Sequence, residues 1–167
     1  MGETLRQRIK QRRFDSPAHE AVLNLLVASG HVRQLVDAAC ETHGITQAQY
    51  NVLRILRGAH PDGYPRGEIG GRMVERAPDV TRLIDRLERR KLAERARCAA
   101  DRRQSITRIT LAGLDLLRRM DPILRAIHRR LAARLSPRDV RELSRICELL
   151  YGGEVGVTRD RPAKRRR

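Results

Sequence analysis

Arginine side chains gather in one stretch of the chain, at spacings that suit contact with a nucleic acid. Arg82, Arg86 and Arg89 recur at helical spacing, and Arg102 and Arg103 stand side by side in a short polar run. A guanidinium group is planar and carries five donors, so it pairs through two parallel hydrogen bonds with a phosphate or with the edge of a guanine. This chemistry predicts a polyanionic partner.

The helical arginines require an amphipathic helix to present them. Apolar residues recur at i, i+3, i+4 and i+7 on the other side, namely Val80, Leu83, Ile84 and Leu87. Pro78 and Asp79 mark the start, since the fixed φ of proline suits a first helical turn and a carboxylate complements the positive end of the helix dipole. We therefore expect a helix from near residue 78, with one face packed and the other free to touch a partner.

The second arginine group requires a hairpin. Residues 93–98 and 105–111 carry alternating or β-branched character and flank a polar turn at residues 99–104. Arginines on a narrow protrusion can enter the minor groove of a duplex while a neighbouring helix fills the major groove. Thr110 is then placed to cap a new helix that begins at Leu111.

Three residues near the start of the predicted helix are the candidates for contact with base edges or flanking phosphates: Asp79, Thr81 and Arg82. Arg82 is best suited to a bidentate guanine contact, and Arg86, one turn further, is expected to hold a phosphate. The alternative for Arg82 is a solvated side chain or an ion pair with Asp85 or Glu88.

At the hairpin tip, Arg102 and Arg103 are the expected wing contacts, and Asp101 is placed to orient one of them through an ion pair. As a charge cluster alone, the same residues would make a plain polar turn.

The runs PDVTRLIDRLERRKL and DRRQSITRITLAG resemble the MarR family of bacterial transcription regulators, whose wing has the form D-x-R and whose second wing strand runs into an L-T-x-x-G-like helix start. The matching positions are Asp101, Arg103, Ile109, Thr110 and Gly113. The resemblance implies a mainly α protein with a small β-hairpin wing. In the terms of that family this is a winged helix-turn-helix with N- and C-terminal dimerisation helices.

Two features depart from the family pattern. Lys91 stands where the family usually has a glycine that closes the recognition helix, and a lysine in a left-handed conformation would cost about 1 kcal/mol relative to glycine. Gly70 and Gly71 lie inside the preceding helix, predicted over residues 68–74, and should weaken it. The ends of these two helices are therefore where the structure should differ.

The expected organisation has three parts. Residues 1–15 form a basic N-terminal arm, residues 16–151 a MarR-like domain, and residues 152–167 a disordered basic tail. Within the domain the DNA-reading head spans residues 46–111, and the segments 16–44 and 111–151 flank it as dimerisation helices. Caps are predicted at Ser16 with Pro17, at Thr46 with Gln49, and at Ser136 with Pro137, whereas Pro122 should kink or break the helix that contains it.

The flanking helices offer more apolar surface than a small reading head can cover, so pairing with a second copy would bury the remainder. MarR-like proteins are dimers through these segments, and the resemblance implies a homodimer here. A twofold dimer predicts a pseudo-palindromic double-stranded operator with half-sites roughly 10 bp apart. The alternative is that the apolar stripes only complete an intramolecular core.

Regulation has weaker signals. The family commonly releases DNA when a small, often phenolic, anion binds between the dimerisation helices and the head, and His31, Arg33 and Tyr50 are the candidates for lining such a space. The alternative is that they are ordinary packing or solvated residues. Cys98 lies among arginines near the wing, which favours thiolate and oxidation, although a chance surface cysteine would look the same. Neither the histidines nor the cysteines show metal-ligand spacing, so no metal or other cofactor is expected.

Composition limits the function classes. The chain has 36 Lys and Arg against 20 Asp and Glu, a net charge of +16, which favours polyanions without giving sequence specificity. We expect a DNA-binding transcriptional regulator, a repressor released by a small anionic ligand, with no membrane span and a cytoplasmic location. The alternative is a non-specific nucleic-acid-binding or architectural protein, although scarce aromatic residues disfavour single-strand binding. No nucleophile elbow, P-loop or dinucleotide motif is present, so we expect no catalytic residues and no enzyme.

Overall fold

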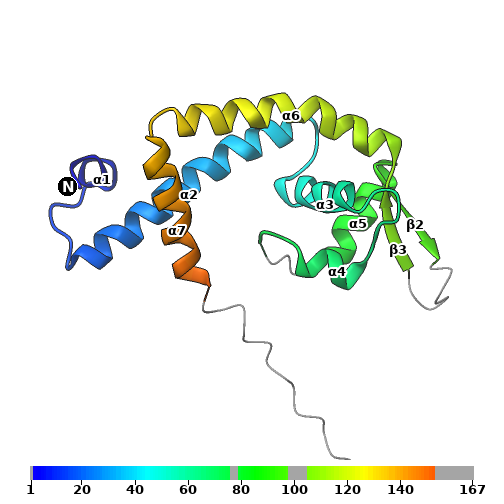
Figure 1. Ribbon diagram of the computed structural model, residues 1–167, viewed down its shortest axis with the longest axis horizontal. Helices are drawn as coiled ribbons and strands as arrows, with labels where there is room; N and C mark the ends of the chain where they lie inside the picture. The colour runs from blue at the N-terminus through cyan, green and yellow to red at the C-terminus, as the bar shows by residue number, and fades with distance from the viewer. Residues whose placement is uncertain (1, 76–78, 98–104, 153–167) are drawn as a thin grey trace, which may run out of the picture. The chain divides into compact units, whose positions relative to one another are not determined.

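The computed structural model describes residues 2–75, 79–97 and 105–152, and the chain divides into two compact units at residues 1–127 and 128–167. Figure 1 shows the elements in chain order. They are α1 (Glu3–Ile9), α2 (Pro17–Glu41), α3 (Gln47–Gly58), β1 (Tyr64–Pro65), α4 (Arg66–Gly71), α5 (Val80–Arg89), β2 (Ala93–Arg97), β3 (Ser105–Ile109), α6 (Leu111–Ala132) and α7 (Pro137–Tyr151). The first unit holds α1 to α5, the sheet and most of α6, whereas α7 belongs to the second.

The helix starts follow the predicted caps. Ser16 accepts the backbone N–H of His19 at 3.1 Å, and Thr46 and Gln49 bond to each other's backbone N–H at 3.2 and 2.9 Å. Ser136 makes the same reciprocal pair with Asp139 at the start of α7. Each of these bonds satisfies a donor that the first turn of a helix leaves free, so these three predictions are confirmed.

Thr110 caps α6 as predicted and also joins it to the end of α5. Its hydroxyl accepts the backbone N–H of Gly113 at 3.1 Å and donates to the carbonyl oxygen of Lys91 at 2.7 Å. One side chain therefore serves the first turn of α6 and the residue that closes α5.

The predicted hairpin forms, and the sheet has a third strand that the sequence analysis missed. The strand order is β1-β3-β2, all antiparallel, with Ala93 opposite Ile109 at the base of the hairpin. Residues 58–67 are rich in turn-forming glycine and proline, but Tyr64 pairs with Thr107 and Pro65 with Ile106. Proline lacks a donor, and β1 is an edge strand where that loss is tolerated.

The core of the first unit lies between α3, α5, the sheet and α6. Figure 1 shows α3, α4 and α5 gathered beside β2 and β3. Fully buried side chains include Leu53 and Leu56 of α3, Ile84 and Leu87 of α5, and Leu117 of α6. The apolar stripe predicted for α5 is thus packed, and its polar face remains outside.

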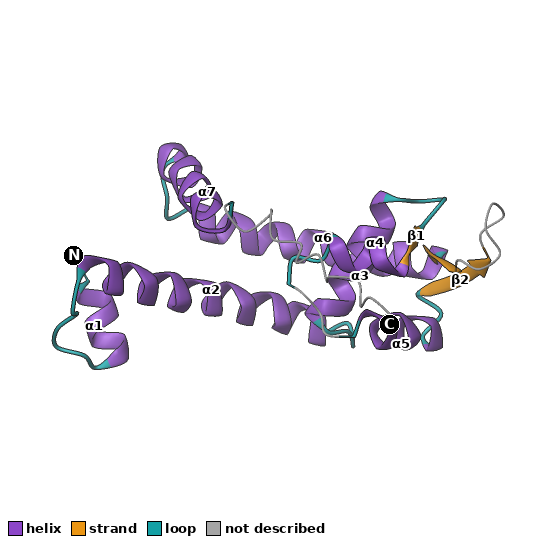
Figure 2. Cartoon of the chain, turned by 90° about the horizontal axis from the view of Figure 1, so that it is seen from below, coloured by secondary structure: helices purple, strands orange, loops and turns teal. Residues whose placement is uncertain are grey.

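One helix differs from its predicted extent, and another was not predicted. The helix predicted over residues 68–74 is α4, which begins two residues earlier and ends at Gly71 after six residues. The shortness agrees with two glycines near its end, since glycine is among the weakest helix formers. In the segment expected as a basic arm, the structure has the unpredicted helix α1, which lies beside the start of α2 in Figure 2 with Leu5 buried.

Pro122 and Lys91 are two residues from which we expected a disturbed helix. We expected Pro122 to kink or break its helix, but α6 continues through it without interruption, so a break is excluded. Proline leaves the carbonyl of Arg118 without its helical partner, and Arg118 is exposed, where water can satisfy that carbonyl. Lys91 closes α5 in the left-handed region, at φ 57°, so this helix end does not differ in the way that the departure from the family pattern predicted.

Both units leave apolar side chains uncovered. No residue of α7 is buried, and Leu143, Leu149 and Leu150 are 51%, 69% and 61% exposed. In the first unit Val22 and Leu26 of α2 are 55% and 60% exposed. The folded chain by itself therefore does not bury the apolar stripes of these helices.

Candidate nucleic-acid interface

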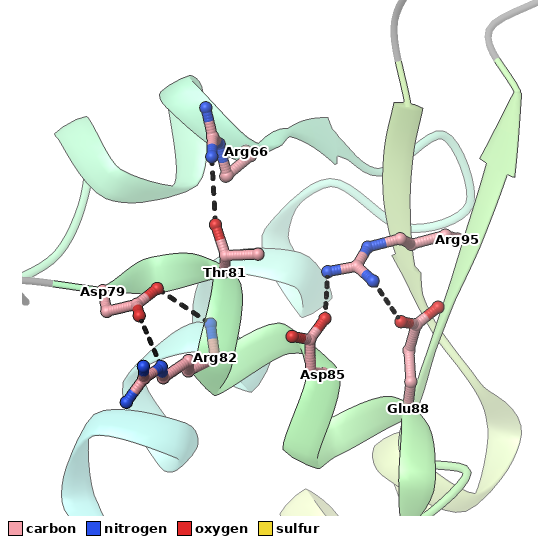
Figure 3. Close-up of polar contacts among 7 residues, drawn as sticks. All are labelled: Arg66, Asp79, Thr81, Arg82, Asp85, Glu88 and Arg95. Carbon is pink, nitrogen blue, oxygen red and sulfur yellow. Dashed lines mark hydrogen bonds and ion pairs between the residues drawn. The ribbon is translucent and has the colours of Figure 1, made fainter.

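The start of α5 is built around Asp79. Its carboxylate accepts the backbone N–H of Arg82 at 3.0 Å, which caps the helix, and also pairs with the Arg82 guanidinium at 2.9 Å (Figure 3). The Arg82 side chain remains 79% exposed. An exposed i,i+3 pair of this kind is weak, so an external acceptor can take the guanidinium from Asp79.

Thr81 is tied to the preceding helix. Arg66, the first residue of α4, donates to the Thr81 hydroxyl oxygen at 3.0 Å (Figure 3). Because Arg66 is the donor, the hydroxyl proton of Thr81 stays available to another acceptor. Sequence reasoning missed Arg66 because only the tertiary fold brings it to α5.

A shallow hollow opens beside this pair. It has a volume of about 400 Å³ and is lined by Pro65, Arg66, Gly67, Thr81, Arg95, Ser105 and Thr107. Two guanidinium groups and three hydroxyl groups thus surround a space next to the start of α5. Such a lining suits an oxyanion, since Arg66 and the three hydroxyl groups can donate hydrogen bonds, whereas the terminal nitrogens of Arg95 already bond to Asp85 and Glu88.

The acidic residues of α5 face the sheet. Arg95 of β2 contacts Asp85 at 2.6 Å and Glu88 at 2.7 Å, one nitrogen to each carboxylate (Figure 3). The alternative partners that the sequence suggested for Arg82 are therefore engaged elsewhere, and Arg82 pairs with Asp79. Sequence reasoning missed Arg95, although acids three residues apart on one helix were a signal that a single cation could bridge them.

Arg86 lies one turn beyond Arg82 on the exposed side of α5. Its side chain has no ion-pair partner within 4.0 Å among residues 2–75, 79–97 and 105–152. An arginine without an ion pair in this part of the chain can neutralise a phosphate, which is the role predicted for it.

Asp101, Arg102, Arg103 and the candidate redox residue Cys98 lie outside the described residues. The strands that lead to them are described up to Arg97 and from Ser105, so only the root of the wing enters the geometry.

The three candidate ligand residues are engaged in separate contacts. Tyr50 is buried and its hydroxyl accepts from Arg54 at 3.1 Å, whereas Arg33 forms a two-bond ion pair with Glu75 at 2.7 and 2.8 Å. His31 is exposed on α2. No hydrogen bond or ion pair in the described structure joins any two of the three.

The described part of the chain also bears on metal binding, the chemistry of the Cys40 thiol and membrane insertion. The residues there contain no group of three His, Cys, Asp or Glu side chains arranged to hold a metal ion. Burial, with Asp37 and Glu41 nearby, raises the pKa of the Cys40 thiol to about 11, so this thiol is neutral at physiological pH. None of the described helices combines the length with the apolar composition that a membrane span requires.

Comparison with known proteins decides the family. The sequence profile of the MarR family matches residues 43–104, which include α3, α4, α5 and β2. A crystal structure of a MarR transcription factor from Planctomyces limnophilus is 37% identical and has a TM-score of 0.63, covering 82% of this chain and 99% of that one. The chain belongs to the MarR family. The resemblance seen in the sequence is therefore confirmed, as is the mainly α fold with a small winged sheet.

Two further proteins extend the comparison. The HTH-type transcriptional regulator MhqR of Bacillus subtilis is 30% identical over 80 residues, which are 48% of this chain and only 54% of MhqR. The crystal structure of an S. aureus MepR-DNA complex has a TM-score of 0.70 at 24% identity and covers 77% of this chain and 94% of its own, a likeness of fold. Members of this family are transcription factors and not enzymes, which confirms the expectation that the chain is no enzyme.

Proposed function

We propose that this MarR-family chain acts in the cytoplasm as a homodimeric repressor that binds a pseudo-palindromic operator and leaves it when a small anionic ligand binds. The observation that carries the proposal is the exposed polar face of α5 beside an antiparallel sheet. Ile84 and Leu87 are buried on one side of this helix, whereas Arg82 and Arg86 are exposed on the other. A helix packed in this way can enter a major groove without unfolding its core contacts.

The reading head is proposed to span residues 46–111, with Arg82 on a guanine, Arg86 on a phosphate, and Asp79 and Thr81 at the helix start. Selection of bound duplexes from a random pool at about 150 mM salt tests this assignment, because nonspecific binding weakens steeply with salt while specific readout persists. We expect two inverted half-sites roughly 10 bp apart. Recovery of unrelated sequences with equal affinity would favour the alternative, a non-specific or architectural DNA-binding protein.

The homodimer is proposed to form through residues 16–44 and 111–151. The exposed apolar residues of α2 and α7 support this, since full burial of one leucine contributes about 1.5–3 kcal/mol. Replacing Leu143 and Leu150 with glutamine should raise the dimer dissociation constant by at least about a hundredfold in sedimentation velocity. The matched control is Arg141→Gln on the polar side of α7, which should leave a dimer. An unchanged dimer in the double variant would show that α7 is not the interface.

The ligand response is proposed to use the hollow lined by Arg66, Thr81 and Arg95. An anion bound there would lie next to the residues proposed to touch DNA, so the two would compete. Phenolic carboxylates should raise the midpoint of thermal unfolding, because a ligand at a hundred times its dissociation constant stabilises by about 2.7 kcal/mol. The same compounds should lower duplex affinity, and Arg66→Ala should abolish both effects. If the ligand still binds to Arg66→Ala, its site lies elsewhere, and His31, Arg33 and Tyr50 are the next residues to test.

A further inference from the structure

The recognition helix carries two negative charges close to its proposed DNA-binding face. Asp85 lies one turn beyond Thr81, and Glu88 lies one turn beyond Asp85. Their side chains are 38% and 27% exposed, so neither charge is hidden from a neighbouring phosphate backbone. Unpaired, two carboxylates at this position would repel the DNA that the surrounding arginines attract.

Arg95 forms an ion pair with each of the two carboxylates. Its two terminal nitrogens bond one to each carboxylate, at 2.6 Å to Asp85 and 2.7 Å to Glu88, and its own side chain is 34% exposed. Figure 3 shows the guanidinium reaching from the strand to the helix and dividing its donors between the two acids. A planar fork can make this bridge, whereas the ammonium group of a lysine is a single point.

The same contact joins β2, the first strand of the hairpin, to α5. Arg95 lies in β2 opposite Thr107 of β3, and these two strands lead to the turn that contains the predicted wing arginines. The bridge therefore ties the root of the wing to the middle of α5. The bridge adds a polar contact to the apolar core in which residues of α5, β2 and β3 already pack together.

We propose that Arg95 is a positioning residue for DNA binding, which acts through Asp85 and Glu88 and not by touching DNA. It offsets their repulsion of the phosphate backbone. This inference rests on the proposed operator binding. It adds a residue that contributes to that binding without contacting a base or a phosphate.

The test compares four proteins on the selected duplex at about 150 mM salt: the unmutated chain, Arg95→Gln, the pair Asp85→Asn with Glu88→Gln, and the triple combination. Arg95→Gln leaves two uncompensated carboxylates and should weaken binding by about tenfold or more. The triple variant removes the carboxylates as well and should bind within about threefold of the unmutated protein. The double variant keeps acceptors for Arg95 and should bind at least as tightly as the unmutated protein. Arg145→Gln, which breaks the ion pair with Glu142 in α7, controls for the loss of one positive charge.

Two readouts separate positioning from a phosphate contact or a purely structural role. A direct phosphate contact predicts that the slope of log affinity against log salt falls by about 1 in every variant without Arg95, whereas positioning predicts an unchanged slope in the triple variant. A purely structural role predicts that the triple variant, which also lacks the bridge, binds as weakly as Arg95→Gln. Circular dichroism and thermal unfolding check that each variant folds.

The inference is overturned if the triple variant binds as weakly as Arg95→Gln, or if Arg95→Gln binds like the unmutated protein. If Arg95→Gln does not fold, the double and triple variants still decide, since positioning requires both to bind. Failure of the unmutated chain to prefer any duplex would instead overturn the proposed function, so the two failures are distinguishable.

Discussion

Replacing Lys91 with glycine should stabilise the protein. Lys91 closes the recognition helix at φ 57°, where its N–H donates to the Glu88 carbonyl at 2.7 Å and the N–H of Leu92 donates to the Leu87 carbonyl at 2.9 Å. Those bonds need only the backbone, so glycine keeps them. The exposed lysine side chain makes no polar contact within the described structure that the substitution would remove.

The size of the gain follows from two opposing terms. A left-handed conformation costs an ordinary L-residue about 1–2 kcal/mol, which glycine avoids. Glycine also gives the unfolded chain more conformational freedom, which reduces that gain by about 0.4–1 kcal/mol. The net stabilisation should be about 0.5–1 kcal/mol, or a rise of about 1–4 °C in the unfolding midpoint for a chain of this size.

Differential scanning calorimetry at a fixed protein concentration measures the effect. Lys91→Ala removes the same charge and keeps the left-handed cost, so it should not raise the midpoint. Lys10→Gly changes a second lysine, at φ 54° after α1, where a terminal helix can fray without global unfolding and the shift should be smaller. Equal shifts for Lys91→Gly and Lys91→Ala, or a lower midpoint for Lys91→Gly, would refute the strain explanation.

Three further outcomes are expected. Gly113→Ala should lower the free energy of unfolding by about 1–3 kcal/mol in urea titrations, because its Cβ would press on the backbone carbonyl of Leu92; an unchanged value would mean that α6 can shift there. Cys40, whose pKa rises from 9.0 to about 11, should contribute stability that is complete below pH 9 and lost as pH rises toward 11, and Cys40→Ala should lack this dependence. Arg82→Ala should weaken operator binding by about 1–3 kcal/mol and relax one base preference in a duplex-selection assay. Arg118→Ala, on the exposed side of α6, should change neither, and equal effects of both variants would reject the base contact.

Local rules predicted much of the fold from the sequence. The Thr46 and Gln49 capping box, the Ser136 cap and the apolar stripe of α5 each depend on residues within one or two turns, so the sequence contains all the information that they need. The hairpin strands were predictable for the same reason, because alternation and a polar turn are local signals.

Features that depend on distant residues were missed. β1 has two residues and exists only because Thr107 and Ile106 supply partners more than forty positions later in the chain. The contact of Arg66 with Thr81 and the bridge of Arg95 to two acids are likewise tertiary, although both lie within the site. The break expected at Pro122 does not occur. The tendency of proline to end a helix applies to an isolated helix, whereas Leu117 and Leu124 on either side of Pro122 are held in the core.

The Thr110 hydroxyl limits how the recognition helix can move. It is hydrogen-bonded to Lys91 just past the end of α5 and to the first turn of α6 at once. A motion that separates these helix ends must leave either a carbonyl or an amide without a partner, and each loss costs about 1 kcal/mol or more. The hinge for any swing of α5 should therefore lie at its N-terminal end, while its C-terminal end travels with α6 as one piece.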